Sequence, residues 1–227
     1  MPSRNTIKIY VKDGHYHIYN RGVDKRVIFK DRQDHKVFLN HLKVSLSPPP
    51  NPAELQQTYA LQGASLRDKP RMPKNFSKEI DLLAFCLMPN HFHLLIKQKS
   101  KGAMESFMRS ITTRYSMYFN KKYDRVGTLF QGAYKAALIL DDPYLLHLSR
   151  YIHRNPLENP AKPKNIYSSF DSYIGKNKAK WVKPKTILAF FDQAELPFIK
   201  KVITYKNFVE KNTTDSASKL GNLILES

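Results

Sequence analysis

Two histidines, His91 and His93, lie two residues apart inside the apolar segment LMPNHFHLLI. In a β-strand, side chains two residues apart project from the same face, so both imidazoles would face one way and Phe92 the other. Two aligned imidazoles are typical of a metal site. The chain has eight histidines, however, so two surface or hydrogen-bonded side chains explain the pair equally well. The pair alone does not decide between these interpretations.

A phenol and an amide form a second candidate pair near the end of a predicted helix over 141–155. Tyr151 and Asn155, in SRYIHRNP, are four residues apart, which puts them on one helical face about 6 Å apart along the axis. A structural interpretation is open as well, with Tyr151 as a core residue and Asn155 as a C-terminal cap before Pro156. Helical spacing is consistent with both.

Cysteine usage narrows the possible metal chemistry. The only cysteine, Cys86, lies in the apolar run LLAFCLM, and the chain contains neither a CxxC nor an HExxH spacing. An intrachain disulfide and a cysteine-based zinc site are therefore excluded, and we expect Cys86 to be a core residue.

The charge points to a polyanionic partner. Lys and Arg number 38 against 19 Asp and Glu, which gives a net charge of +19. Nucleic acid is the expected partner, because its regularly spaced phosphates attract such a surplus. A membrane surface is less favoured, since the sequence shows neither a basic amphipathic helix nor an apolar anchor. The opening residues lack the apolar core of a signal peptide, so we expect a cytoplasmic protein.

The periodicity predicts alternating strands and helices of the α+β class. A strand, an Asp-Gly turn and a second strand are expected over 8–21, and a helix begins with Asp34 as its N-cap. Met88-Pro89-Asn90 indicates the turn of an antiparallel pair. The remaining expected elements are a helix over 102–124, a strand over 129–140 and the helix over 141–155. This order is that of a ferredoxin-like antiparallel sheet with helices on one face, to which the last helix is an addition.

The chain is expected to divide into a main domain and an extension. Residues 1–160 would form the domain, with a proline-rich insertion at about 47–75 that is unsuited to a central strand. Residues 161–227 would be a partly helical extension with a frayed tail after Thr213.

Five segments together resemble a known family. YHIYNRGVDKRVIF, LMPNHFHLLI, GTLFQGAYK, YIHRNP and YSSFDSYIG occur in this order between roughly residues 10 and 182. They resemble the single-tyrosine HUH transposases, particularly the REP-associated tyrosine transposases. The resemblance implies a ferredoxin-like fold that acts on single-stranded or hairpin DNA.

The resemblance also implies roles for the candidate residues. His91 and His93 would hold a divalent metal, Asn155 would complete its site, and Tyr151 would attack DNA. Oxygen and imidazole ligands with open positions suit Mg²⁺ or Mn²⁺. Tyr115 and Tyr118 are rival nucleophiles, but neither is followed by Asn or Gln at the fourth position, which favours packing roles.

The implied chemistry is cleavage and rejoining of a DNA strand. Attack by the Tyr151 oxygen leaves a 5′-phosphotyrosine and a free 3′-hydroxyl, so no nucleotide cofactor is needed. His147, one turn earlier, is a candidate general base, with surface hydrogen bonding as its alternative role.

Ten residues are candidate DNA contacts, although a solvated charged face is the ordinary explanation for such residues. They are Arg21, Lys25, Arg26, Arg109, Arg114, Lys121, Lys122, Gln131, Lys135 and Arg154. Phe130 stands where the family often has Trp, and could stack on an unpaired base or pack in the core. Ala133 stands where the family often has Arg, which removes one cation from this block.

The predicted function is that of a metal-dependent enzyme that nicks and joins single-stranded hairpin DNA, acting as a monomer or a homodimer. A non-catalytic, domesticated transposase that binds nucleic acid is the first alternative. An RNA-processing nuclease that uses the ribose 2′-hydroxyl is the second.

Overall fold

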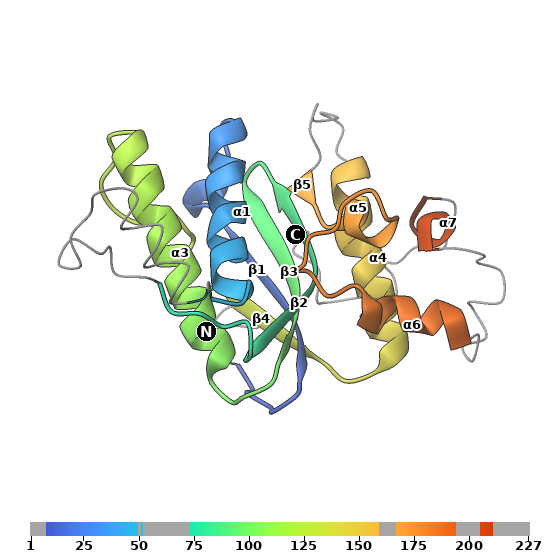
Figure 1. Cartoon of the computed structure of the whole chain (residues 1–227). Helices are drawn as coiled ribbons and strands as arrows, with labels where there is room; N and C mark the ends of the chain where they lie inside the picture. Colours follow the sequence, from blue (N-terminus) through green and yellow to red (C-terminus); the bar gives the residue numbers. More distant parts are fainter. Residues whose placement is uncertain (1–7, 50, 52–72, 159–166, 194–204, 211–227) are drawn as a thin grey trace.

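A computed structural model describes residues 8–49, 51, 73–158, 167–193 and 205–210 of the chain. Five strands form one antiparallel sheet in the order β4-β1-β3-β2-β5 (Figure 1). The strands are β1 (His15–Arg21), β2 (Ile80–Met88), β3 (His91–Gln98), β4 (Lys135–Ile139) and β5 (Tyr167–Ser168). The first four strands and the two helices between them give the ferredoxin-like order, so the predicted α+β class is confirmed.

Helices cover both faces of the sheet, and each face has its own apolar core (Figure 1). On one face, α1 (Arg32–Leu46) and α3 (Ala103–Lys122) pack on side chains such as Phe92. On the other, α4 (Asp142–Glu158) packs on side chains such as Leu95. The shorter helices are η1 (Val23–Lys25), α5 (Phe170–Tyr173), α6 (Lys185–Gln193) and α7 (Tyr205–Glu210), and the last three contribute to the core on the α4 face. None of the described helices is long and apolar enough to cross a membrane.

Successive side chains of a strand point to opposite faces of the sheet, which explains why helices can pack on both faces. Phe92, Leu94 and Ile96 of β3 point into the core under α1 and α3, whereas His93 and Leu95 point towards α4. Cys86, which pairs with His93 across β2 and β3, is fully buried on the α4 face, as expected of a core residue. Burial raises the pKa of its thiol, so it is an apolar packing group.

Four predicted boundaries are wrong. The strand expected over 129–140 begins only at Lys135, because residues before it form a loop with Gly132 at positive φ. Residues 8–14 form no strand, because the Tyr16 side chain hydrogen-bonds to their backbone. Its hydroxyl accepts from the Val11 amide and donates to the Ile9 carbonyl. Helix α1 starts after Asp31, whose carboxylate accepts from two backbone amides, and Asp34 is instead the reciprocal partner in this capping box. Helix α4 continues through Pro156 to Glu158, because a proline in the last turn removes only one backbone hydrogen bond.

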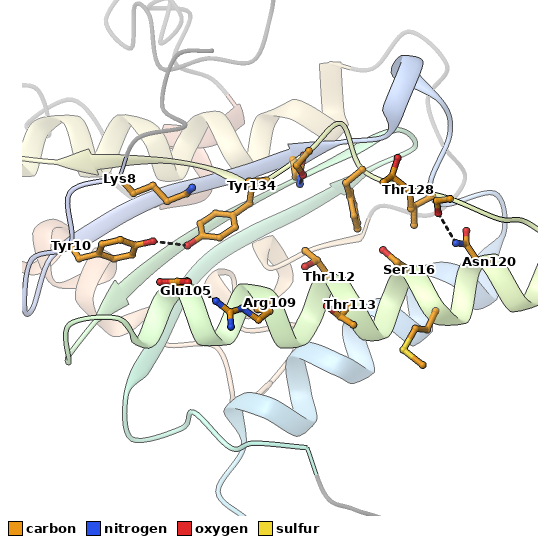
Figure 2. A pocket seen from close by; sticks show the side chains of 17 residues that line it. Lys8, Tyr10, Glu105, Arg109, Thr112, Thr113, Ser116, Asn120, Thr128 and Tyr134 are labelled. Atoms are coloured by element: carbon orange, nitrogen blue, oxygen red, sulfur yellow. Dashed lines mark hydrogen bonds and ion pairs between the residues drawn. The ribbon is translucent and has the colours of Figure 1, made fainter. Parts of the chain in front are cut away.

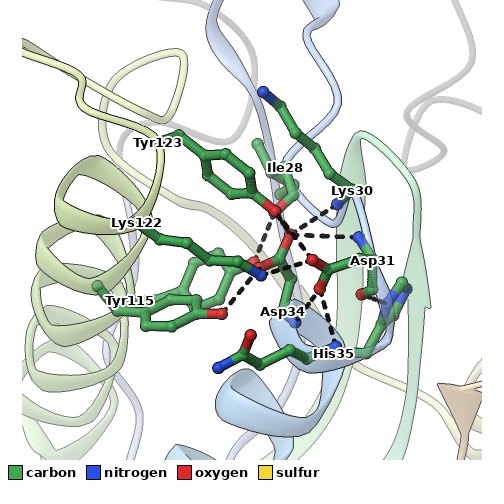
Figure 3. A network of polar contacts seen from close by, with 10 residues as sticks. Ile28, Lys30, Asp31, Asp34, His35, Tyr115, Lys122 and Tyr123 are labelled. Atoms are coloured by element: carbon green, nitrogen blue, oxygen red, sulfur yellow. Dashed lines mark hydrogen bonds and ion pairs between the residues drawn. The ribbon is translucent and has the colours of Figure 1, made fainter.

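A polar network joins the start of α1 to the end of α3 (Figure 3). The Lys122 ammonium lies 2.6 Å from the Asp31 carboxylate and 2.8 Å from that of Asp34, which is fully buried. Tyr118 and Tyr123 donate their hydroxyls to Asp34 at 2.9 and 2.7 Å. Because every charge has an opposite charge or a donor, the network fixes the two helices without leaving a bare buried carboxylate.

Most of the proline-rich insertion, residues 50 and 52–72, lies outside the described residues, as does the tail after Thr213. The two helices α6 and α7 lie in the region predicted to be a partly helical extension. Ile187 of α6 and Tyr205 of α7 pack into the same core as α4, so the described part of the extension is continuous with the sheet domain.

Candidate catalytic and metal-binding site

The two histidines of β3 lie side by side on the α4 face of the sheet. Their ring centroids are 4.9 Å apart. His91 is partly exposed near the start of the strand, and His93 is completely buried. The expectation that both imidazoles face the same way agrees with this arrangement.

The hairpin turn orients His91. Its Nδ1 donates to the side-chain oxygen of Asn90 at 2.7 Å, which leaves Nε2 with a free lone pair. Burial, and to a smaller extent the positive charge of Arg21, lower the pKa of His91 to about 4. The ring is therefore neutral at physiological pH, as a metal ligand must be.

His93 is oriented by a third histidine, His17 of β1. The His17 Nε2 and the His93 Nδ1 are hydrogen-bonded at 2.9 Å, and both side chains are fully buried. The buried Nε2 of His93 has no hydrogen-bond partner among the described residues. Burial, followed by the proximity of His91 and His17, holds the pKa of His93 well below its usual value. A buried neutral nitrogen without a partner is what a metal ion or a ligand donor would satisfy.

Sequence reasoning missed His17. A signal for it was present, because His15, His17, Tyr19 and Arg21 alternate along β1. The register of β1 against β3 places Tyr19 opposite His93 and Arg21 opposite His91, so this alternating set shares the face of the two histidines.

Tyr151 of α4 lies over the imidazoles. Its ring centroid is 5.6 Å from that of His93 and 6.4 Å from that of His17, in edge-on orientations. Only 8% of the residue is exposed. A phenol and two imidazoles of one chain therefore share one partly closed site.

Hydrogen bonds anchor the segment of α4 that carries Tyr151. His153 is fully buried between the Tyr205 hydroxyl of α7 and the Ser169 hydroxyl, each 2.7 Å from a ring nitrogen. The Tyr205 hydroxyl also donates to Ser149 at 3.1 Å, and Ser169 accepts from the Phe85 amide of β2 at 2.9 Å. The helix is thus tied on one side to α7 and on the other to the sheet.

The other two α4 candidates have different environments. Asn155 is partly exposed one turn beyond Tyr151. His147 is only 5% exposed, and its ring lies 6.0 Å from that of Phe208 on α7. His147 is therefore a buried side chain beside α7 rather than a surface one.

The donor atoms present suit an open metal site rather than a closed one. The described residues contain no group of three or more His, Cys, Asp or Glu side chains able to hold a metal ion. The Nε2 atoms of His91 and His93 are suitable nitrogen ligands, because neither is used in a hydrogen bond within the described part of the chain. Other ligands would have to be an amide such as Asn155, water or a substrate phosphate.

Three of the ten candidate DNA contacts gather near the histidines. The Arg21 guanidinium binds the Gln131 side-chain oxygen with two contacts of 3.3 Å, and its charge acts on His91. Lys135 pairs with Tyr19 across β1 and β4, and its ammonium lies 5.9 Å from the Tyr19 ring. These groups make the rim of the site basic.

The structure gives other candidates intrachain partners. Arg114 donates to Ser45 at 2.8 Å and Lys122 belongs to the network of Figure 3, so both hold α1 against α3. Arg109 pairs with Glu105 at 2.6 Å and Arg26 with Asp24 at 3.7 Å. Lys25, Lys121 and Arg154 are at least partly exposed. As DNA contacts, all seven stay predictions.

The rival tyrosines of α3 have structural contacts on the opposite face. Tyr115 is fully buried and donates its hydroxyl to the Ile28 carbonyl, and Tyr118 donates to Asp34. Burial raises the pKa of both phenols, with Asp34 adding to the effect. Neither is suited to act as a nucleophile.

The sheet order and the site define an α+β protein with paired histidines on a central strand and a tyrosine on the helix above them. Residues 74–155 match the family model described as "Transposase IS200 like". This segment includes β2, β3 and α4 up to Asn155, and over it the resemblance drawn from the sequence is confirmed.

A solved structure described as a REP-associated tyrosine transposase bound to a REP hairpin is similar, with 17% identity and a TM-score of 0.48; the alignment covers 78% of this chain and 90% of that one. No match was found among the curated proteins.

Proposed function

We propose that the chain is a transposase-type enzyme that cleaves and rejoins single-stranded, hairpin-bearing DNA through a covalent bond to Tyr151. The supporting observation is the position of the Tyr151 ring, 5.6 Å from His93, inside a segment that matches the transposase family. A phenol beside the neutral imidazole of His93, which is itself next to that of His91, has with the basic rim the groups that phosphoryl transfer to tyrosine requires.

The proposed reaction is a balanced transesterification. The Tyr151 oxygen attacks the phosphorus and loses its proton, and the bond to the 3′ oxygen breaks. The products are a 5′-phosphotyrosine and a 3′-hydroxyl, which takes up a proton. One ester replaces another, so the 3′-hydroxyl of a second strand can reverse the step without an added energy source.

The residues around Tyr151 would have separate roles in the reaction. His91 and His93, with Asn155, would hold Mg²⁺ or Mn²⁺, which withdraws charge from the scissile phosphate. Arg21, held by Gln131 beside His91, orients the phosphate by its charge. The almost complete burial of Tyr151 limits water as a competing nucleophile.

The experiment is detection of a covalent adduct. The full chain is incubated with Mn²⁺ and a labelled single-stranded hairpin oligonucleotide, and denaturing gels reveal any labelled protein. Wild type should form the adduct, and Tyr151→Phe should lose it, because it lacks only the attacking oxygen. Tyr118→Phe, which alters a rival tyrosine on the opposite face, should keep it. Equal adduct in wild type and Tyr151→Phe would refute the proposed nucleophile.

One observation favours a second candidate function, binding without catalysis. Only 8% of Tyr151 is exposed, so a DNA phosphate reaches its oxygen only if the surrounding side chains move. EDTA separates the two candidates. DNA binding that survives EDTA, with no adduct in Mn²⁺, would support the binding protein.

A further inference from the structure

A groove of about 630 Å³ lies on the α3 face of the sheet, opposite to the face that carries Tyr151 (Figure 2). One wall is α3, and the other is the end of β1 together with the loop that precedes β4. The volume is in the range of sites that bind molecules of nucleotide size. The lining residues are Lys8, Tyr10, Asn20, Glu105, Arg109, Thr112, Thr113, Ser116, Met117, Asn120, Gly127, Thr128, Leu129, Phe130, Gly132, Ala133 and Tyr134.

The α3 wall is a row of hydrogen-bonding groups. Thr112, Ser116 and Asn120 recur at helical spacing on the side of α3 that faces the opposite wall in Figure 2, and Thr113 lines the groove beside them. Met117, beside them, is 68% exposed. Thr112 donates to the Met108 carbonyl and Asn120 to the Gly127 carbonyl, each at 2.8 Å. The hydroxyls of Thr113 and Ser116 are therefore the groups of this row that can donate to phosphate oxygens or to base edges.

Two cations lie at the end of the groove near Tyr134. The Lys8 ammonium lies 4.4 Å from the centre of the Tyr134 ring, and the Arg109 guanidinium forms an ion pair with the Glu105 carboxylate. Tyr10 and Tyr134 are hydrogen-bonded through their hydroxyls at 3.4 Å. The combination of cations with aromatic rings is typical of surfaces that bind single-stranded nucleic acid.

Two glycines leave space in the loop wall. Gly127 and Gly132 have φ angles of +89° and +101°, and apart from chain neighbours no heavy atom of the described residues lies within 4 Å of the position of an added Cβ. A side chain at either position would be strained, so glycine keeps this space clear, although both carbonyls already accept hydrogen bonds within the chain.

The same loop connects the groove to the candidate active site. Gln131 binds Arg21 on the rim of that site, while its neighbours Phe130 and Gly132 line the groove. Asn20 donates to the Gly132 carbonyl at 3.2 Å and holds the loop against β1. Residues 130–132 therefore border both the groove and the rim of the candidate site.

We propose that this groove binds the unpaired DNA nucleotides that flank the position cleaved at Tyr151, an inference that rests on the proposed function. The occupant is an unpaired strand because it combines the anionic backbone that a chain of charge +19 attracts with bases that can use both hydroxyl donors and rings.

The test measures how much an unpaired flank adds to binding. Fluorescence anisotropy in EDTA compares a labelled hairpin with and without a single-stranded flank, using the full chain. Wild type should bind the flanked hairpin more tightly. Thr113→Glu places a carboxylate on the exposed groove wall and should lose about fivefold or more of that gain. The matched control is Ser106→Glu, which makes the same charge change at an exposed α3 position outside the groove; it should keep the gain.

Three outcomes would overturn the inference: a flank that adds no affinity to wild type, Thr113→Glu that keeps the full gain, or Ser106→Glu that loses as much as Thr113→Glu. Melting curves by circular dichroism check that both variants fold. The adduct assay in Mn²⁺ keeps the two proposals separate. An adduct without flank-dependent binding refutes only the groove, and flank-dependent binding without an adduct refutes only the catalytic proposal.

Discussion

At the scale of single residues, the candidate site depends on which ring nitrogen is free. The Nδ1 atom of His91 is hydrogen-bonded to Asn90, and the Nδ1 atom of His93 is hydrogen-bonded to His17. In each ring the Nε2 atom therefore points away from the residue that binds Nδ1. Both histidines could be proposed from their two-residue spacing. His17 could not be paired with His93 from the sequence, because the contact depends on strand register between residues 76 positions apart.

The Asn90 contact gives a prediction about metal affinity. Asn90→Ala removes the acceptor that fixes the His91 tautomer, so Mn²⁺ should bind about tenfold or more weakly. Asn90→Asp is the matched control, because a carboxylate oxygen can still accept from Nδ1, and it should bind Mn²⁺ at least as well as wild type. Titration calorimetry of the two variants measures the difference. Unchanged affinity in Asn90→Ala would show that the turn does not orient a metal ligand.

At the scale of elements, the strands were easier to predict than the ends of the helices. The apolar runs on either side of Met88-Pro89-Asn90 predicted β2 and β3 well. Strand β5 has only two residues, too few for a hydrophobic pattern in the sequence. It forms because it pairs with the edge of β2. The N-cap of α1 was misassigned because Asp31 and Asp34 both fit the local pattern, and only the observed hydrogen bonds distinguish them.

The network of Figure 3 predicts how stability depends on its lysine. Lys122→Met leaves the fully buried carboxylate of Asp34 without its positive partner, so the free energy of unfolding should fall by about 3 kcal/mol at neutral pH. Lys121→Met, at the exposed neighbouring position, should change it by no more than about 0.5 kcal/mol. Urea denaturation measures both, and equal values would show that the ion pair contributes nothing.

The same variant tests the pH dependence. The hydrogen bond from Lys122 is the main cause that lowers the pKa of Asp31 from 3.8 to about 2. For Asp34, burial would raise the pKa, but hydrogen bonds from Lys122, Tyr123 and Tyr118 lower it overall. A carboxyl group whose pKa is lower in the folded than in the unfolded protein stabilises the fold when the pH is above the unfolded-state pKa. This stabilisation is lost as the pH falls from about 4 to about 2. Melting temperatures should therefore fall over this interval in wild type and fall less in Lys122→Met.

At the scale of the whole molecule, the composition predicted a surplus of positive charge. Contacts within the fold engage only some of these cations. Lys122 and Arg114 neutralise or bind neighbours within the fold, whereas Arg21 and Lys135 lie at the rim of the candidate site. Composition could suggest a polyanionic partner but could not say which cations face it, because that depends on how the helices pack.

The surplus charge predicts a steep salt dependence of DNA binding. If about three phosphates are neutralised, affinity for a single-stranded oligonucleotide should fall by about twentyfold between roughly 50 and 200 mM salt. Anisotropy titrations over this range measure the slope, and Arg21→Gln should reduce it by somewhat less than one unit. Binding that does not respond to salt would argue against a phosphate-contacting surface.

The placement of α3 and α4 on opposite faces of one sheet has a mechanical consequence for any ligand that would touch both. A polymer reaching from Tyr151 to the Thr113 side has to bend around the sheet, past the loop that precedes β4. Double-helical DNA resists sharp bending, since its persistence length is about 150 base pairs. If DNA contacts both the candidate active site and the groove, as we propose, this arrangement would favour a flexible single strand over a stiff duplex.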